Sequence, residues 1–299
     1  LRRSSSSVMC LLTVPATSNS MNLSTRLFMP EGGVDMGGRG GASHRQTAGG
    51  LASITTFLKN AYGANHAQAV LAILQNAPDH IRAMWEQYAA QFRATNMRRD
   101  NGAFYSPRDD SVHLHIASVA RGDAISTPYS VLFHEYGHMT DYLIARSEGQ
   151  GRYSAYSELF QGIGPGNKPI IRSGSGGGLL GRTAKDELEG HLSRLRRQNP
   201  GMTREQAARS LVSEAMGKYS MRDRSDISDM FEGAGIGISY PLGSGHGLDY
   251  WTTRDSGKEI FAEIISAEAS HPGSLTAIKD YFPRTYKVYQ DMMKARKRR

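Results

Sequence analysis

One segment, residues 131–144, combines the apolar pattern of a buried helix with two histidines that need partners. Its apolar residues recur at helical spacing from Val131 to Ile144, so we expect a helix over the whole segment. Inside it stands the run His134-Glu135-Tyr136-Gly137-His138. Histidines four residues apart project from one helix face, about one turn from each other, as two ligands of a tetrahedral zinc ion must. Polar side chains in so apolar a helix are costly unless a partner satisfies them, so the segment predicts a metal site.

Glu135 lies between the two histidines and is expected to point beside the metal. There it can take a proton from a water molecule that the metal makes more acidic. It can then deliver that proton to the leaving amine of a cleaved peptide bond. The pattern therefore favours a zinc-dependent peptidase with Glu135 as general base. The alternative is a helix with two surface histidines.

A catalytic zinc site also needs a third protein ligand. The run from Lys258 to Ile265 places Glu259 and Glu263 four residues apart on one face of an otherwise apolar helix, where a carboxylate must be paired or bind metal. We expect Glu259 to be the third ligand and Glu263 to bond the free ring nitrogen of a ligand histidine. The alternative is two exposed glutamates on an amphipathic helix. Glu268, farther along, is expected to face solvent.

Other residues compete for a place at the metal. Asp141 shares the helix face of His138 and could support a ligand histidine through a hydrogen bond. His113 and His115 lie on one side of an alternating segment, which suits either a metal or a half-exposed strand. The metzincin pattern is excluded, because residues 139–149 contain no third histidine.

A peptidase further needs a donor for the oxyanion that forms at the cleaved carbonyl. Tyr250 and His246 stand in the loop just before Glu259, and His246 lies between two glycines, which favours exposure in a cleft. Tyr240 is a third candidate. The residues alone leave the choice among the three open.

The chain divides into a leader, a folded domain and a basic tail. Residues 1–50 are rich in Ser, Gly and Met without periodicity, so we expect a linker or disordered leader. The domain is expected to span residues 51–293, with a helical and glycine-rich insertion at about 162–224. Beyond the two helices above, periodicity predicts a helical start from Leu51, a helix from Pro78 to about Thr95, a hairpin from Ala103 to Ile116, helices at 184–198, 203–216 and 227–232, and one closing helix from Leu275 to Met293.

Charge and composition exclude several classes of protein. No apolar run approaches the roughly 20 residues of a membrane-spanning helix. Five of the positive charges behind the net +8 lie in the tail, residues 294–299, so nucleic acid is expected to bind at most weakly and through this tail. The single cysteine, Cys10, excludes an intramolecular disulfide and a cysteine-bound structural zinc. The basic and apolar start of the chain imitates a signal peptide only loosely.

Two segments, Phe133 to Tyr142 and Glu259 to Ile264, resemble the gluzincin zinc peptidases. The likeness is to the catalytic domain of anthrax lethal factor and to the metallopeptidase domains of phage head-morphogenesis and polymorphic-toxin proteins. The loop with Gly245-His246-Gly247 and Tyr250-Trp251, and the closing Tyr281-Phe282-Pro283, are similar to the phage-associated members. The resemblance covers residues 51–293 and is weakest through the insertion. It implies one zinc ion held by His134, His138 and Glu259, with Glu263 orienting a ligand histidine and Tyr250 assisting the oxyanion.

Together these patterns predict an α+β, zincin-like domain that is mostly helical with a small twisted mixed sheet. We expect a zinc endopeptidase of a phage-associated or toxin type that acts on a peptide or protein substrate. Such a protein is expected in a virion or as a secreted effector rather than in the cytoplasm. The alternative is a phage structural or head-associated protein that keeps zinc without turnover. Glu135 argues against it, since a purely structural site needs no base.

Overall fold

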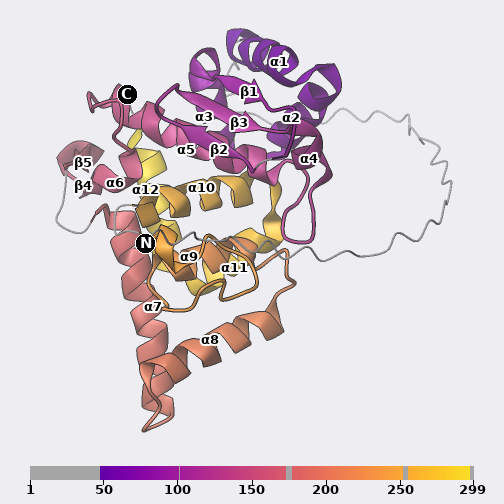
Figure 1. The fold of residues 1–299 in the computed structure, drawn as a ribbon. Coiled ribbons are helices and arrows are strands. Elements are labelled where there is room, and N and C mark those ends of the chain that lie inside the picture. The colour runs from indigo at the N-terminus through magenta and orange to yellow at the C-terminus, as the bar shows by residue number, and fades with distance from the viewer. Residues whose placement is uncertain (1–47, 101, 173–176, 252–254, 297–299) are drawn as a thin grey trace, which may run out of the picture. The chain divides into compact units, whose positions relative to one another are not determined.

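A computed structural model describes residues 48–100, 102–172, 177–251 and 255–296 (Figure 1). These residues belong to one unit, Gln46–Arg299. They are mostly helical with a small mixed sheet, which confirms the α+β class predicted from the sequence. The leader predicted for residues 1–50 lies outside the described residues as far as residue 47, and the first helix begins at Ala48. None of the described helices is long and apolar enough to cross a membrane.

The helices largely follow the apolar periodicity of the sequence, and several begin beside a glycine or a proline. Proline fits the first turn of a helix because its missing N–H would have no partner there. The α-helices are α1 (Ala48–Tyr62), α2 (Ala64–Asn76), α3 (Asp79–Tyr88), α4 (Ile116–Arg121), α5 (Ser130–Ser147), α6 (Tyr156–Leu159), α7 (Leu179–Gln198), α8 (Arg204–Lys218), α9 (Ser225–Gly233), α10 (Asp255–Ser270), α11 (Pro272–Tyr281) and α12 (Pro283–Arg296).

The mixed sheet has the order β1-β3-β2, with strands Ala94–Asn96, Ser111–Leu114 and Phe104–Ser106. Strands β2 and β3 are antiparallel and confirm the predicted hairpin. Strand β1 pairs with β3 in parallel. The helix predicted to reach Thr95 is therefore wrong at its end. α3 ends at Tyr88, a 3-10 turn follows at Ala89–Gln91, and residues 94–96 form the ladder with β3 instead.

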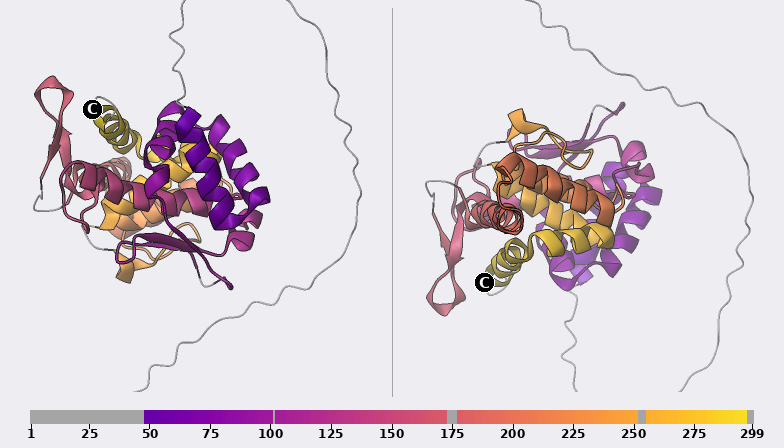
Figure 2. Two further views of the ribbon diagram at one scale, coloured as in Figure 1. Left: turned by 90° about the horizontal axis from the view of Figure 1, so that it is seen from above. Right: turned by 90° about the horizontal axis from the view of Figure 1, so that it is seen from below.

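A second, two-stranded sheet lies in the glycine-rich region. Strands β4 (Phe160–Ile163) and β5 (Pro169–Ile171) form an antiparallel hairpin that the sequence prediction did not contain. In both views of Figure 2 this hairpin extends away from the helices. The following helix, α7, packs against α10 and α12. Its buried Glu187 accepts hydrogen bonds from the backbone N–H groups of Arg284 (2.7 Å) and Thr285 (2.8 Å), so α7 caps the start of α12.

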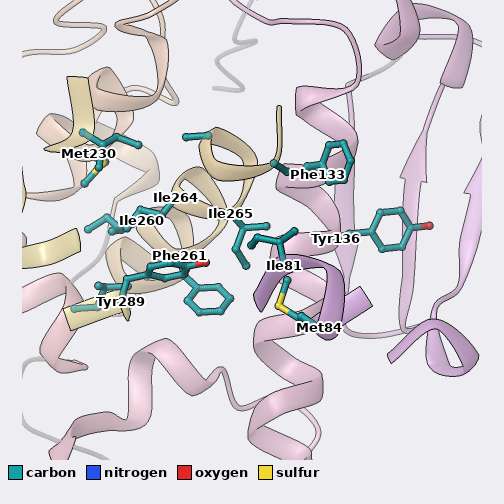
Figure 3. Close-up of a cluster of buried hydrophobic side chains, with 14 of the residues drawn as sticks. Ile81, Met84, Phe133, Tyr136, Met230, Ile260, Phe261, Ile264, Ile265 and Tyr289 are labelled. Atoms are coloured by element: carbon teal, nitrogen blue, oxygen red, sulfur yellow. The ribbon is translucent and has the colours of Figure 1, made fainter. Parts of the chain in front are cut away.

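The core is built around α5 and α10, which make the most extensive helix contact in the described part of the chain. Figure 3 shows apolar side chains of α10, such as Phe261 and Ile265, facing Ile81 and Met84 of α3. On α5, Tyr136 is fully buried, and its hydroxyl lies 2.9 Å from that of Tyr62 on α1. This packing holds one side of α5 against the aromatic core and leaves the side that carries His134 and His138 for polar partners.

Close approach of the two central helices depends on Gly137. A Cβ atom at this position would lie 3.0 Å from Ala262 Cα and 3.3 Å from Ala262 Cβ. Such distances are tighter than ordinary van der Waals contact, so any side chain here would push α5 and α10 apart. The glycine in the histidine motif thus lets the glutamates of α10 reach the histidines.

Gly137→Ala is expected to destabilise the fold by about 1–3 kcal/mol, because overpacking outweighs the gain in helix propensity. It should also weaken metal binding, because the ligands on the two helices move apart. Gly190→Ala on α7 is the matched control: a Cβ there meets no atom within 4 Å, so this variant should be slightly more stable than wild type. Thermal unfolding and zinc titration of both variants check this. Equal stability and zinc affinity of Gly137→Ala and Gly190→Ala would contradict it.

The C-terminal part differs from the prediction in two respects. The predicted single closing helix is two helices, α11 and α12, because Pro283 lacks the N–H needed to continue α11 and begins α12 instead. The predicted basic tail also begins later, since α12 runs to Arg296. The Arg296 side chain is buried and donates a hydrogen bond to Gln87 (3.0 Å). Residues 297–299 lie outside the described residues.

Glu268 was expected to face solvent, and this is wrong. Its carboxylate is buried on α10. It accepts hydrogen bonds from the hydroxyls of Tyr286 (2.7 Å) and Tyr289 (2.9 Å) on α12 and lies 2.5 Å from the His80 ring on α3. These partners satisfy the buried charge and tie three helices together.

Candidate metal centre

Three side chains from α5 and α10 converge on one point. His134 and His138 lie one turn apart on α5, and their Nε2 atoms are 3.1 Å from each other. Glu259, near the start of α10, places its Oε2 atom 3.5 Å from His134 Nε2 and 3.2 Å from His138 Nε2. Four zinc ligands at the usual distance of 2.0–2.1 Å would stand about 3.4 Å apart at the corners of a tetrahedron. The three atoms therefore form a triangle of the right size for one face of a zinc site.

The chemistry of the donors fits the same ion. Two imidazole nitrogens and one carboxylate oxygen form a ligand set typical of catalytic zinc. Glu259 Oε2 is buried and accepts no hydrogen bond from the described residues, although burial of an unsatisfied carboxylate oxygen is costly. The other oxygen, Oε1, accepts a hydrogen bond from the Tyr250 hydroxyl at 2.6 Å. A cation between the three residues would supply the missing partner.

The carboxylates around His134 and His138 favour a positive charge between them. Burial alone lowers the pKa of His134, but the carboxylates of Glu263 and Glu259 outweigh it and hold that pKa well above its usual value. Burial also raises the pKa of Glu259, yet His138 and His134 outweigh it and keep that pKa well below its usual range. A metal ion would have to displace a proton from His134, so its affinity should fall as the pH falls.

Glu263 lies beside His134, a candidate ligand, as the sequence predicted. Its Oε2 atom is 3.4 Å from His134 Nδ1, the ring nitrogen that faces away from Glu259. Burial raises the pKa of Glu263 to about 8, with the Asp226 carboxylate acting in the same direction and His134 opposing it. A carboxylate in this position fixes the tautomer and the orientation of the ring.

Asp141 has a different partner from the one predicted. It is fully buried and accepts hydrogen bonds from the Ser157 backbone N–H (2.8 Å) and hydroxyl (2.5 Å), which link α5 to α6. Burial raises the pKa of Asp141 to about 6. No hydrogen bond joins it to His138 among the described contacts, so its part in the centre is limited to its charge.

His113 and His115, the competing histidine pair, do not join the centre. The His113 ring lies 2.8 Å from an Asp109 oxygen and stacks on Phe104 at 4.7 Å. His115 is hydrogen-bonded to Ser118. In the described part of the chain, the group suited to a metal is His134, His138 and Glu259.

Glu135 follows His134 on α5 and is buried. Within the described residues its carboxylate makes neither a hydrogen bond nor an ion pair. Its negative charge stabilises the protonated ring of the neighbouring His134 and helps to raise the pKa of that ring. A carboxylate held beside the metal ligands without a partner is available to exchange protons with a reactant.

Of the three oxyanion candidates, the structure brings Tyr250 to the centre. Its hydroxyl donates to Glu259 Oε1 while the residue remains 44% exposed. Tyr240 is farther out, 55% exposed, and a Cβ at Gly247 would lie 2.9 Å from its hydroxyl, so it packs on the loop backbone instead. In this geometry Tyr250 holds the carboxylate of Glu259, the candidate third ligand.

Tyr250→Phe is expected to lower zinc affinity about 10- to 100-fold, as loss of a hydrogen bond to a metal ligand typically does. Competition with a chromogenic chelator measures the affinity. Tyr240→Phe, in the same loop but without contact to Glu259, is the control and should bind zinc like wild type. An unchanged affinity for Tyr250→Phe, with only turnover reduced, would assign Tyr250 to the oxyanion and refute the orienting role.

His246 stacks on Tyr250, with ring centroids 4.2 Å apart. Its Nδ1 atom lies 2.9 Å from Asp229 Oδ1 on α9. Burial lowers the pKa of His246, but the hydrogen bond to Asp229 outweighs this and raises it from 6.5 to about 9. The ring is therefore charged at neutral pH and presents a cation on the loop side of the centre.

Asp229→Asn should lower the pKa of His246 from about 9 toward 6.5. Because the folded-state pKa is raised, the stabilisation from the charged ring is complete below pH 6.5 and disappears as the pH rises through 9. The stability lost in Asp229→Asn should thus shrink over this interval. NMR titration of the ring in the metal-free protein, with unfolding at several pH values, checks it. An unshifted pKa would show that Asp229 is not the cause.

Sequence reasoning missed Glu232, which organises the loop that carries His246 and Tyr250. The residue is 1% exposed. Its carboxylate accepts hydrogen bonds from the backbone N–H groups of Tyr240, His246 (3.1 Å) and Gly247 (3.0 Å) and from the Trp251 indole (2.9 Å). Gly245 is required beside it, because its φ is 132° and a Cβ would lie 2.8 Å from Glu232 Oε2. The only signal in the sequence was a glutamate directly before a long glycine-rich loop.

Comparison of the chain with protein-family models, with curated proteins and with solved structures finds no match. The interpretation of the centre therefore depends on its own geometry.

Proposed function

We propose that this chain is a zinc-dependent endopeptidase with a zincin-like, gluzincin-type domain. The observation that carries the proposal is the triangle of His134, His138 and Glu259, whose edges of 3.1, 3.2 and 3.5 Å match one face of a zinc tetrahedron. Glu135 next to His134 favours an enzyme over a structural zinc site, because a structural site uses four protein ligands and no base.

The chain's own residues can perform the proton transfers of peptide hydrolysis. A bound zinc ion would polarise the cleaved carbonyl and lower the pKa of the attacking water. Glu135 accepts a proton from that water as its oxygen bonds to the carbonyl carbon. It then donates the proton to the amine nitrogen as the carbon–nitrogen bond breaks, which leaves a carboxylic acid and an amine. Water is the only co-reactant.

The loop with His246 and Tyr250 would complete the cleft on the other side. The charged His246 ring provides a positive field for the oxyanion, and Tyr250 keeps Glu259 in its ligand orientation. Glu263 fixes the His134 ring in the same way.

Metal analysis combined with a peptide digest tests the proposal. We expect one zinc per chain and new amino termini in a mixture of random decapeptides, detected by mass spectrometry. Treatment with a chelator should abolish the cleavage and added zinc should restore it. One zinc per chain without cleavage of any peptide or protein would refute the enzyme and favour a structural protein that keeps the ion.

A further inference from the structure

A groove of about 610 Å³ lies between α7 and the segment of residues 232–251. Its apolar walls are Leu179 at the start of α7 and Leu248 and Trp251 in the loop. Glycines line the side formed by residues 233–237, and a Cβ at Gly235 would meet no atom within 4 Å. At Gly233 a Cβ would instead lie 2.7 Å from the Trp251 ring, so the space for an occupant lies beside Gly235.

The groove adjoins the metal centre through two shared elements. Ser256 lines the groove and stands one helical turn before Glu259 on α10, so both point toward similar sides of that helix. Trp251 also lines it, follows Tyr250 directly, and is held by the same Glu232 carboxylate that fixes the backbone of His246. The groove and the centre therefore share the start of α10 and the loop that carries His246, Tyr250 and Trp251.

The charged groups around the groove do not select a charged occupant. Glu232 already accepts four hydrogen bonds. Arg182 is engaged by Gly177 O and the Gln161 side chain. Lys185 and Asp186 are adjacent and exposed at the rim, and their charges offset each other.

The surface next to the groove is apolar instead. Leu248 is 40% exposed, and Tyr250 and Tyr240 in the same loop are 44% and 55% exposed. Exposed large apolar side chains that gather beside a cleft mark a binding surface. We propose that the groove binds a bulky apolar side chain of the substrate close to the cleaved bond, an inference that rests on the proposed peptidase function.

Two variants test the groove without touching the metal ligands, His246 or Tyr250. Thr183→Trp fills it from α7, and Leu248→Ala removes part of its apolar wall. The controls are Ser193→Trp, on the same helix but away from the groove, and Ile163→Ala, whose side chain is exposed to a similar extent, 38% against 40% for Leu248. All variants are digested with the random decapeptide mixture in the full chain with zinc.

Wild type and both controls should cleave with a strong preference for Leu, Phe, Tyr or Trp at one fixed position beside the cleaved bond. Leu248→Ala should reduce that preference about tenfold or more in relative kcat/KM, the scale of lost contacts in an apolar pocket. Thr183→Trp should shift it toward Ala and Gly, while zinc content stays at one per chain.

If Thr183→Trp and Leu248→Ala cleaved with the wild-type preference, the inference about the groove would be wrong, while the proposed peptidase function would stand. Cleavage by wild type without any apolar preference would have the same meaning. No zinc-dependent cleavage by wild type would refute the proposed function, and the groove inference with it.

Discussion

Glu135→Gln should bind zinc as tightly as wild type and hydrolyse peptides about 10²- to 10⁴-fold more slowly, the usual contribution of a positioned general base. Glutamine has the shape of glutamate but cannot accept the proton of the attacking water. The buried position of Glu135 beside His134, with no hydrogen bond to the described residues, means that the substitution breaks no structural contact. Initial rates on one cleaved decapeptide, with zinc measured in the same samples, give both quantities.

The control for this variant is Glu205→Gln on α8, where the glutamate is exposed and paired with Arg209. It should retain wild-type turnover. If Glu135→Gln turned over at the wild-type rate, Glu135 would not be the base. If it lost its zinc, the loss of activity would report on metal binding instead and the assigned role would fail.

Glu259→Ala should lower zinc affinity by more than about 100-fold, beyond the range seen when only a partner of a ligand is lost. The alanine removes one corner of the triangle and leaves two histidines, and it also removes the acceptor for the Tyr250 hydroxyl. Activity at limiting zinc should fall in parallel. Equilibrium dialysis against buffered zinc measures the affinity.

Glu268→Ala provides a matched comparison, because Glu268 is a buried glutamate on the same helix with three partners of its own. It should lower the melting temperature while zinc affinity stays at the wild-type value. Full zinc occupancy of Glu259→Ala would remove Glu259 from the ligand set. Equal loss of zinc in both variants would show that a general weakening of α10 is responsible.

Local patterns were sufficient to predict the helices that carry the candidate ligands. The apolar spacing of residues 131–144 predicted α5, and two glutamates on an apolar run predicted that α10 would meet a polar partner. The convergence of His134, His138 and Glu259 follows from those two helix faces and from Gly137, which lets them approach. For these two helices, the spacing of the apolar residues and the position of the polar residues among them indicate the same buried helix face.

Features that depend on distant partners were not predictable in this way. Glu268 is buried because His80 and two tyrosines of α12 satisfy it, and those residues are far from it in sequence. Strand β1 forms because β3 pairs with it, and its three residues are too few to show the alternation of a strand. Glu232 accepts hydrogen bonds mostly from backbone N–H groups. Almost any residue type can supply such a donor, so the sequence does not reveal these partners.

Titration of the metal-free chain with zinc, while hydrolysis of one decapeptide is followed, tests the central claim most directly. The rate should rise linearly and break sharply at one equivalent of zinc, and Glu135→Gln should take up the same equivalent with almost no rise in rate. A rate that is independent of added zinc, or a Glu135→Gln rate equal to that of wild type, would contradict a zinc peptidase built on His134, His138 and Glu259.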